Sequence, residues 1–82
     1  MDKKVELYAY QYEQEKDTYH INQKPIYTFE NMKEFEEKSG ILAVVYFMQH
    51  PLKKLGFCYC FEGQDITNKE NIKFVSYGFM ED

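Results

Sequence analysis

The segment from Val5 to Tyr12 alternates between two kinds of side chain. In a β-strand every second side chain points to the same face of the sheet, so Tyr8, Tyr10 and Tyr12 would line one face. The small apolar residues at 5, 7 and 9 would line the other. A strand that is apolar on both faces has to be covered on both. The segment therefore predicts a sheet with one face packed by its own chain and a second, ring-rich face that meets something else.

The chain has 82 residues, of which 44% are hydrophobic and 18% aromatic. This composition predicts a folded protein rather than a disordered one, because the rings supply much of the area that a small core needs. At this length we expect one domain, residues 1–82, with a small stability margin.

Apolar residues recur every three positions from Phe29 to Phe35, with charged residues between them. This spacing is typical of an amphipathic helix. Thr28 is a candidate N-cap, and Gly40 supplies the residue type that most often ends a helix. We therefore expect a helix over residues 29–39.

The other segments have strand character. Residues 4–13 and 18–22 read as a hairpin, and the β-branched and aromatic run 41–48 reads as a central strand covered on both faces. Residues 55–62 and 72–79 follow as further strands. The expected fold is α+β in the order ββαβββ: a single antiparallel sheet of four or five strands with one α-helix packed on one face.

We expect small residues to face the helix and the rings to gather on the far side as a partner-binding surface. An alternative is that the strands curl and the rings form a second core against the 49–54 and 63–71 loops. The small set is Ala9, Ala43, Cys58, Cys60, Ser76 and Gly78, and the predicted partner-binding residues are Tyr8, Tyr10, Tyr12, Phe57, Tyr59, Phe61, Tyr77 and Phe79 with the helix carboxylates Glu34 and Glu37.

The formal charge is −4, and all ten basic residues are lysine. A general nucleic-acid binder needs a basic stripe, and arginine is the side chain that grips phosphate best, so the composition disfavours nucleic acid as a partner. Stacking of single strands on an aromatic sheet remains the weaker alternative. The carboxylates form either a DNA-mimicking array or solvated surfaces, and the interspersed lysines favour the second.

Cys58-Tyr59-Cys60 does not have the spacing of a metal site. Residues two apart in a strand are separated by roughly 6.6 Å, whereas two thiolates on one zinc ion lie under about 4 Å apart. The same separation excludes a disulfide between them. We expect two buried hydrophobic thiols, no metal and no cofactor. A catalytic pair with His20 or His50 is disfavoured because both cysteines lie within a strand, so we expect no enzyme activity.

No secretory signal pattern is present, and the longest apolar run is too short to span a membrane, so we expect a cytoplasmic protein. The richness in Lys, Asn and Ile suits AT-rich codons, which suggests a low-GC bacterium or one of its phages. We expect a non-enzymatic protein-binding module. The favoured role is a phage-type inhibitor that occludes a host defence or nucleic-acid-processing enzyme, and the alternative is a homodimeric accessory protein.

Overall fold

The computed structural model describes residues 3–50 and 55–75. These residues form one sheet of five antiparallel strands and one α-helix. The predicted α+β class, with its single antiparallel sheet and one helix, is confirmed; one strand comes before the helix rather than after it. The elements are β1 (Val5–Glu13), β2 (Thr18–Ile21), β3 (Tyr27–Phe29), α1 (Met32–Gln49), β4 (Leu55–Phe61), a 3₁₀ turn η1 (Lys69–Asn71) and β5 (Lys73–Val75).

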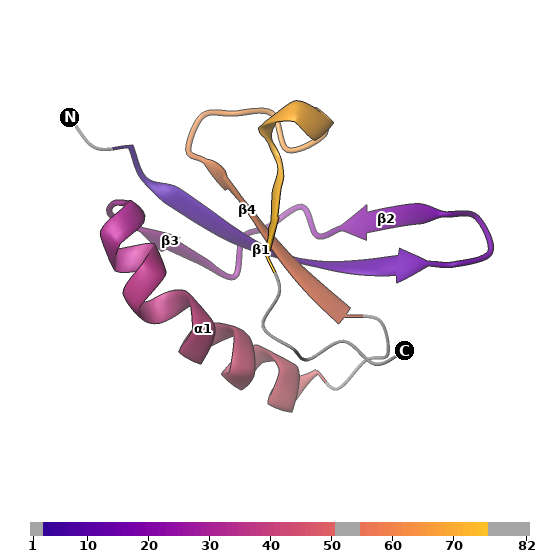
Figure 1. The fold of residues 1–82 in the computed structure, drawn as a ribbon, viewed down its shortest axis with the longest axis horizontal. Coiled ribbons are helices and arrows are strands. Elements are labelled where there is room, and N and C mark those ends of the chain that lie inside the picture. The colour runs from indigo at the N-terminus through magenta and orange to yellow at the C-terminus, as the bar shows by residue number, and fades with distance from the viewer. Residues whose placement is uncertain (1–2, 51–54, 76–82) are drawn as a thin grey trace.

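Strand β1 lies at the centre of the sheet (Figure 1). Along one side its first residues pair with β3 and its last residues pair with β2. Along the other side it pairs with β4 over seven residues, and β5 adds to the outer side of β4. The β1–β2 hairpin projects away from α1, which packs below the opposite end of β1 (Figure 1). Within the described sheet, β1 therefore takes part in every strand pairing except the one between β4 and β5.

The alternation predicted for β1 is confirmed. Val5, Leu7 and Ala9 are fully buried on the face that α1 covers. There they meet Phe29, Phe35, Ala43, Leu55 and Phe57 to form the main core. Tyr8 and Tyr10 point to the other face and belong to a second cluster. Both faces of β1 are thus packed, as an all-apolar alternation requires.

The prediction that residues 41–48 form a central strand is wrong: this run belongs to α1, which continues through Gly40 to Gln49. β-branched residues lose only a few tenths of a kcal/mol in a helix, and glycine about 1 kcal/mol, so packing can override both. Ala43 is buried in the core, and Leu42, Tyr46 and Phe47 pack against it. Burial of these side chains decides the conformation of the run.

The start of α1 also differs from the prediction. Asn31, not Thr28, is the N-cap, and its side-chain oxygen accepts a hydrogen bond of 2.9 Å from the backbone N–H of Glu34. Phe29 lies in β3, opposite Val5 of β1. The three-residue spacing of Phe29, Met32 and Phe35 predicted a single helix. In the structure it comes from one residue of β3 and two residues of α1, all of which pack in the same core.

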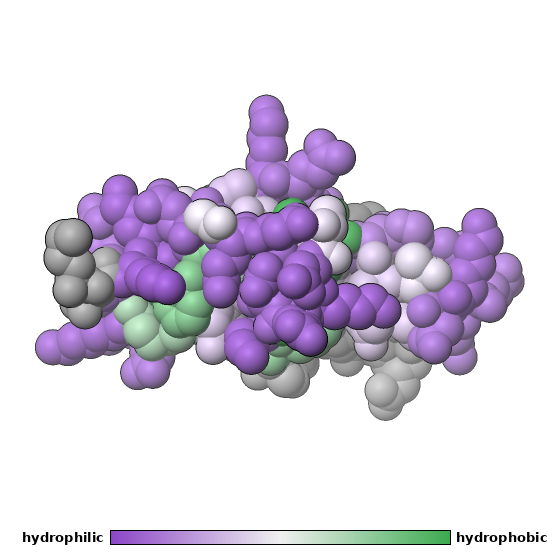
Figure 2. All heavy atoms as spheres, turned by 90° about the horizontal axis from the view of Figure 1, so that it is seen from above, coloured by the Kyte–Doolittle hydropathy of each residue, from purple (hydrophilic) through white to green (hydrophobic). Residues whose placement is uncertain are grey.

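The surface is mainly polar on the side seen in Figure 2, where hydrophobic groups show only in small areas between hydrophilic ones. The C-terminal half of α1 differs, because Ile41, Val44, Val45 and Met48 are exposed. Within the described ranges 3–50 and 55–75, no helix is long and apolar enough to cross a membrane.

Candidate functional site

The aromatic residues of β1 and β4 lie on opposite faces of the sheet. Tyr8 pairs with Cys58 and Tyr10 with Gly56. Directly paired residues of antiparallel strands share a face, so the tyrosines of β1 lie beside the small residues of β4. The rings of β4 lie on the helix side instead. The predicted single ring face that combines the two strands is therefore wrong for Phe57, Tyr59 and Phe61, which pack in or against the main core.

Tyr8 and Tyr10 are buried, with 5% and 6% of their surface exposed. They pack with Cys58, Cys60 and Ile72 and with the half-buried Ile66, which come from β4 and the connection to β5. The self-buried alternative, in which the 63–71 loop covers the rings, thus holds for these two tyrosines. They belong to a second core and are not available to a partner.

The small residues divide between the two faces. Ala9 faces α1 in the main core, as predicted; Ala43 lies in the same core but on α1 itself rather than on a strand that faces it, and Cys58 and Cys60 lie on the far face. The correction has a steric reason: the large tyrosines of β1 need small neighbours on β4. Ser76 and Gly78 lie outside the described residues, as do Tyr77 and Phe79 of the predicted binding set.

Burial keeps the groups of the second core neutral. The Tyr8 hydroxyl donates a hydrogen bond of 3.1 Å to the Glu6 carboxylate, and burial, with this bond, raises the pKa of Tyr8. Burial, together with the neighbouring Cys60, raises the pKa of the Cys58 thiol to about 12. Both groups hold their protons at neutral pH, and Cys58 packs in the second core.

Four rings form a cluster on the far face. Tyr10 is the buried member, Tyr19 and Phe74 pack against it, and Tyr12 packs against Tyr19. The ring centroids of Tyr10 lie 5.3 Å from Tyr19 and 5.2 Å from Phe74, while Tyr19 lies 4.9 Å from Tyr12 and 5.1 Å from Phe74. We call these four residues the ring cluster. Tyr19 and Phe74 come from β2 and β5, the two ends of the sheet path, so the sheet coils until these ends meet above Tyr10.

The ring cluster keeps two rings accessible, because 46% of Tyr19 and 51% of Phe74 are exposed. They border a groove of about 640 Å³, within the usual size range of small-molecule and side-chain pockets. Polar lining from the same segments includes Asp17, Thr67 and Lys69. We call this the ring groove, and its apolar lining is Tyr19, Ile21, Ile66, Ile72 and Phe74.

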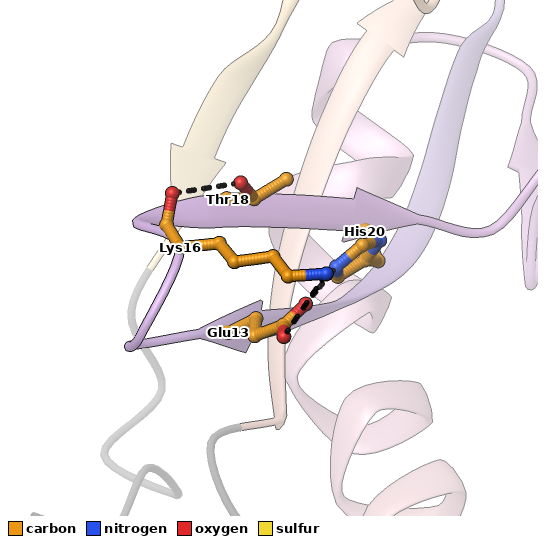
Figure 3. A network of polar contacts seen from close by, with 4 residues as sticks. All are labelled: Glu13, Lys16, Thr18 and His20. Atoms are coloured by element: carbon orange, nitrogen blue, oxygen red, sulfur yellow. Dashed lines mark hydrogen bonds and ion pairs between the residues drawn. The ribbon is translucent and has the colours of Figure 1, made fainter.

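Polar contacts fix the β1–β2 turn that carries Tyr19. On the ring side the Tyr12 hydroxyl donates a hydrogen bond of 2.6 Å to Asp17, and this bond raises the pKa of Tyr12. On the opposite side the Glu13 carboxylate contacts the His20 ring at 2.9 Å and the Lys16 ammonium at 3.9 Å (Figure 3). Asp17 has a φ of 50°, the left-handed conformation of a tight turn. Side-chain contacts thus stabilise the hairpin turn on both faces of the sheet.

The opposite wall of the ring groove is also braced by local hydrogen bonds. Asp65 accepts bonds of 2.9 and 2.7 Å from the backbone N–H and the hydroxyl of Thr67, and these bonds lower the pKa of Asp65. The Asn71 amide donates to the backbone oxygen of Asp65 at 3.0 Å. These bonds close the loop around Ile66, which packs on the second core. Local hydrogen bonds thus hold this wall of the groove in place.

The predicted helix carboxylates lie away from the ring groove. Glu34 is half-buried in the first turn of α1 and Glu37 is exposed one turn later. Helix α1 packs on the main core, whereas the groove belongs to the other face of the sheet. The structure thus separates Glu34 and Glu37 from Tyr8, Tyr10 and Tyr12, whereas the predicted rings of β4 lie on the same side of the sheet as α1.

The two histidines occupy different elements. His20 lies on β2, and His50 caps α1 with its ring stacked on Tyr46 at 4.4 Å. Among residues 3–50 and 55–75, no group of three or more His, Cys, Asp or Glu side chains is placed to hold a metal ion.

Sequence reasoning missed Tyr19, Phe74, Ile66 and Ile72 as members of this site. The predicted hairpin could have indicated that Tyr19 belongs to the site, because it places Tyr19 beside Tyr12. Nothing local indicates that Phe74 meets Tyr19, since that contact depends on the coiling of the whole sheet.

Comparisons of the chain with protein-family models, with curated proteins and with solved structures give no match.

Proposed function

We propose that this protein is a protein-binding module that receives a loop or an extended segment of its partner in the ring groove. One observation carries the proposal: Tyr19 and Phe74 are half exposed yet fixed, because each contacts the other and both contact buried Tyr10. Anchored aromatic rings beside a formed groove are the usual centre of a protein-binding surface.

Preorganisation is what favours this groove over the other exposed rings. A partner that orders mobile side chains loses affinity to conformational entropy, and rings already held in place avoid that loss. Tyr19 and Phe74 are held by several ring contacts, and the loops that carry the rest of the lining are closed by hydrogen bonds.

A basic partner suits the charge of the chain, which is −4 overall. Asp17 and Lys69 both line the groove, so the attraction rests on the net charge of the chain rather than on the groove itself. A nucleic-acid-processing enzyme presents such a basic surface, so the proposal includes inhibition of a host enzyme of this class. Binding should then weaken as salt rises, because salt screens the charged contribution but not the apolar one.

The test uses the purified chain as bait in extracts of a native host, followed by titration of the captured protein. We expect Tyr19→Ala and Phe74→Ala each to weaken binding at least about tenfold, the effect of losing a central aromatic anchor. Tyr27→Ala is the matched control, since Tyr27 is 44% exposed but lies on β3 against Phe29, away from the groove. It should bind as the unaltered chain does.

Equal capture by all three variants and the unaltered chain would refute the ring groove as the binding site. A shift of labelled single-stranded DNA or RNA at physiological salt, lost in Phe74→Ala, would instead support base stacking on the same rings. Circular dichroism of each variant checks that the fold is retained.

A further inference from the structure

A second apolar surface lies on the outer side of α1, away from the ring groove. Its four side chains are Ile41, Val44, Val45 and Met48, which are 69%, 37%, 45% and 74% exposed. We call them the helix stripe. They recur at the first, fourth, fifth and eighth positions of an eight-residue stretch, so they form one continuous line along the helix.

Among the described residues, the helix stripe belongs to neither hydrophobic cluster. Helix α1 buries Phe35, Ser39 and Ala43 against the sheet instead. Its C-terminal half is therefore apolar on both sides, a pattern typical of helices that are buried all round. Every charged residue of α1 lies before Gly40, so the stripe has no charge within it.

The positions of the stripe residues are symmetric along the helix, so they would face the same positions of a second, antiparallel copy. Positions 41 and 48 lie equally far on either side of the midpoint between 44 and 45. In an antiparallel pair of helices with a two-fold axis at that midpoint, Ile41 of one copy meets Met48 of the other, and Val44 meets Val45. A two-fold interface requires this reciprocity. The short valines at the crossing let the helices approach closely, and the longer side chains close the ends.

Charge selects the antiparallel orientation. The first half of α1 carries Glu34, Glu36 and Glu37, with Lys33 and Lys38. The three carboxylates outnumber the two ammonium groups, so a parallel pair would set two net negative halves beside each other, which is unfavourable. An antiparallel pair sends the two acidic halves to opposite ends of the interface.

We propose that the occupant of the helix stripe is a second copy of this chain, packed antiparallel through α1. The contact rests on four side chains, fewer than the roughly 20–30 residues a side of a standard interface, so we expect a reversible dimer with a dissociation constant in the micromolar range or weaker. This dimer does not depend on the ring groove.

A charge-pair experiment tests both the dimer and its direction. We expect sedimentation equilibrium of the full chain to show a monomer–dimer equilibrium. Ile41→Glu and Met48→Lys should each weaken dimerisation at least about tenfold, because each places an unpaired charge in an apolar contact. The double variant Ile41→Glu/Met48→Lys should recover most of the loss, since the new carboxylate of one copy faces the new ammonium of the other. In a parallel dimer like charges would face each other, and the double variant would be the weakest.

Gln14→Glu serves as the control, because it adds a carboxylate at the exposed hairpin turn and should leave dimerisation unchanged. Circular dichroism confirms the fold of each variant, whose altered side chains are all exposed. A monomer at every concentration, dimerisation unaffected by the single changes, or no recovery in the double variant would each overturn the proposal. A monomer that binds an apolar dye through Ile41 and Met48 would assign the stripe to another protein, and one that binds none would mean that the chain covers it itself.

Discussion

Gly56 allows the second core to form. It lies directly opposite Tyr10 across the β1–β4 pair, and a β-carbon at position 56 would overlap the end of the Tyr10 ring. The glycine therefore provides the space that the end of the Tyr10 ring occupies beside β4. Tyr10 in turn supports Tyr19 and Phe74, so the geometry of the ring cluster depends on the absence of one methyl group.

Gly56→Ala should lower the free energy of unfolding by about 1–3 kcal/mol, the usual cost of inserting a methyl group into a packed core. Urea unfolding followed by circular dichroism measures this change. In a Tyr10→Leu background the same substitution should cost less than half as much, because the ring that it meets is gone. An equal cost in both backgrounds would show that the contact with Tyr10 is not the cause.

Cys58 gives stability a dependence on alkaline pH. Its pKa rises from the ordinary 9.0 to about 12 because burial disfavours the thiolate. Above pH 9 the unfolded chain releases this proton while the folded chain keeps it, so stability falls as pH rises. The contribution of Cys58 is fully present below pH 9 and is lost between pH 9 and about 12.

Urea unfolding at a series of pH values tests this dependence. The free energy of unfolding should fall less steeply between pH 9 and 12 in Cys58→Ala than in the unaltered chain. The tyrosines of the second core titrate in the same direction in both proteins, and burial, the main cause of their raised pKa, is common to both. Identical slopes would show that Cys58 does not titrate differently on folding.

At the scale of elements, the predictions for β1, β2 and β4 agree with the structure because their patterns are local. A period of two and a polar turn are enough to indicate a hairpin. The run 41–48 carried no period, and its residue types favour a strand. The run is helical because, as a continuation of α1, it packs Ala43 and its neighbours into the main core. This packing exists only in the folded chain, so the local sequence does not indicate it.

The N-terminus of α1 depends on one side chain. Asn31→Ala removes the hydrogen bond to the backbone N–H of Glu34 and should lower the free energy of unfolding by about 1 kcal/mol. Asn31→Asp keeps the acceptor and adds a charge that suits the helix dipole, so it should cost no more than a few tenths of a kcal/mol. Equal stability of the alanine and aspartate variants in thermal unfolding would contradict the role of Asn31 as the cap.

At the scale of the whole molecule, the two apolar surfaces lie on opposite sides of one sheet. The ring groove sits on the second core, whereas the helix stripe lies on the outer side of the helix that covers the main core. The sheet and a layer of buried side chains separate them. A partner in the ring groove and a second copy on the helix stripe would therefore not compete for space.

We expect the two surfaces to act independently. Val45→Glu should abolish dimerisation and leave capture of the partner unchanged, whereas Tyr19→Ala should weaken capture and leave the dimer intact. Sedimentation and capture measured on the same preparations check this. Loss of both properties in either variant, with the fold retained, would show that the two surfaces are coupled.

The sequence by itself determined the alternation of β1, the α+β class, the burial of both cysteines and the presence of a ring-rich far face. These properties follow from residue type and local period, which act within a few residues. Only the tertiary structure decided that Tyr8 and Tyr10 are buried while Tyr19 and Phe74 are exposed, and that residues 41–48 are helical. The register of β1 against β4 and the coiling of the sheet set these outcomes, because they join residues distant in sequence whose packing free energy exceeds the local preferences.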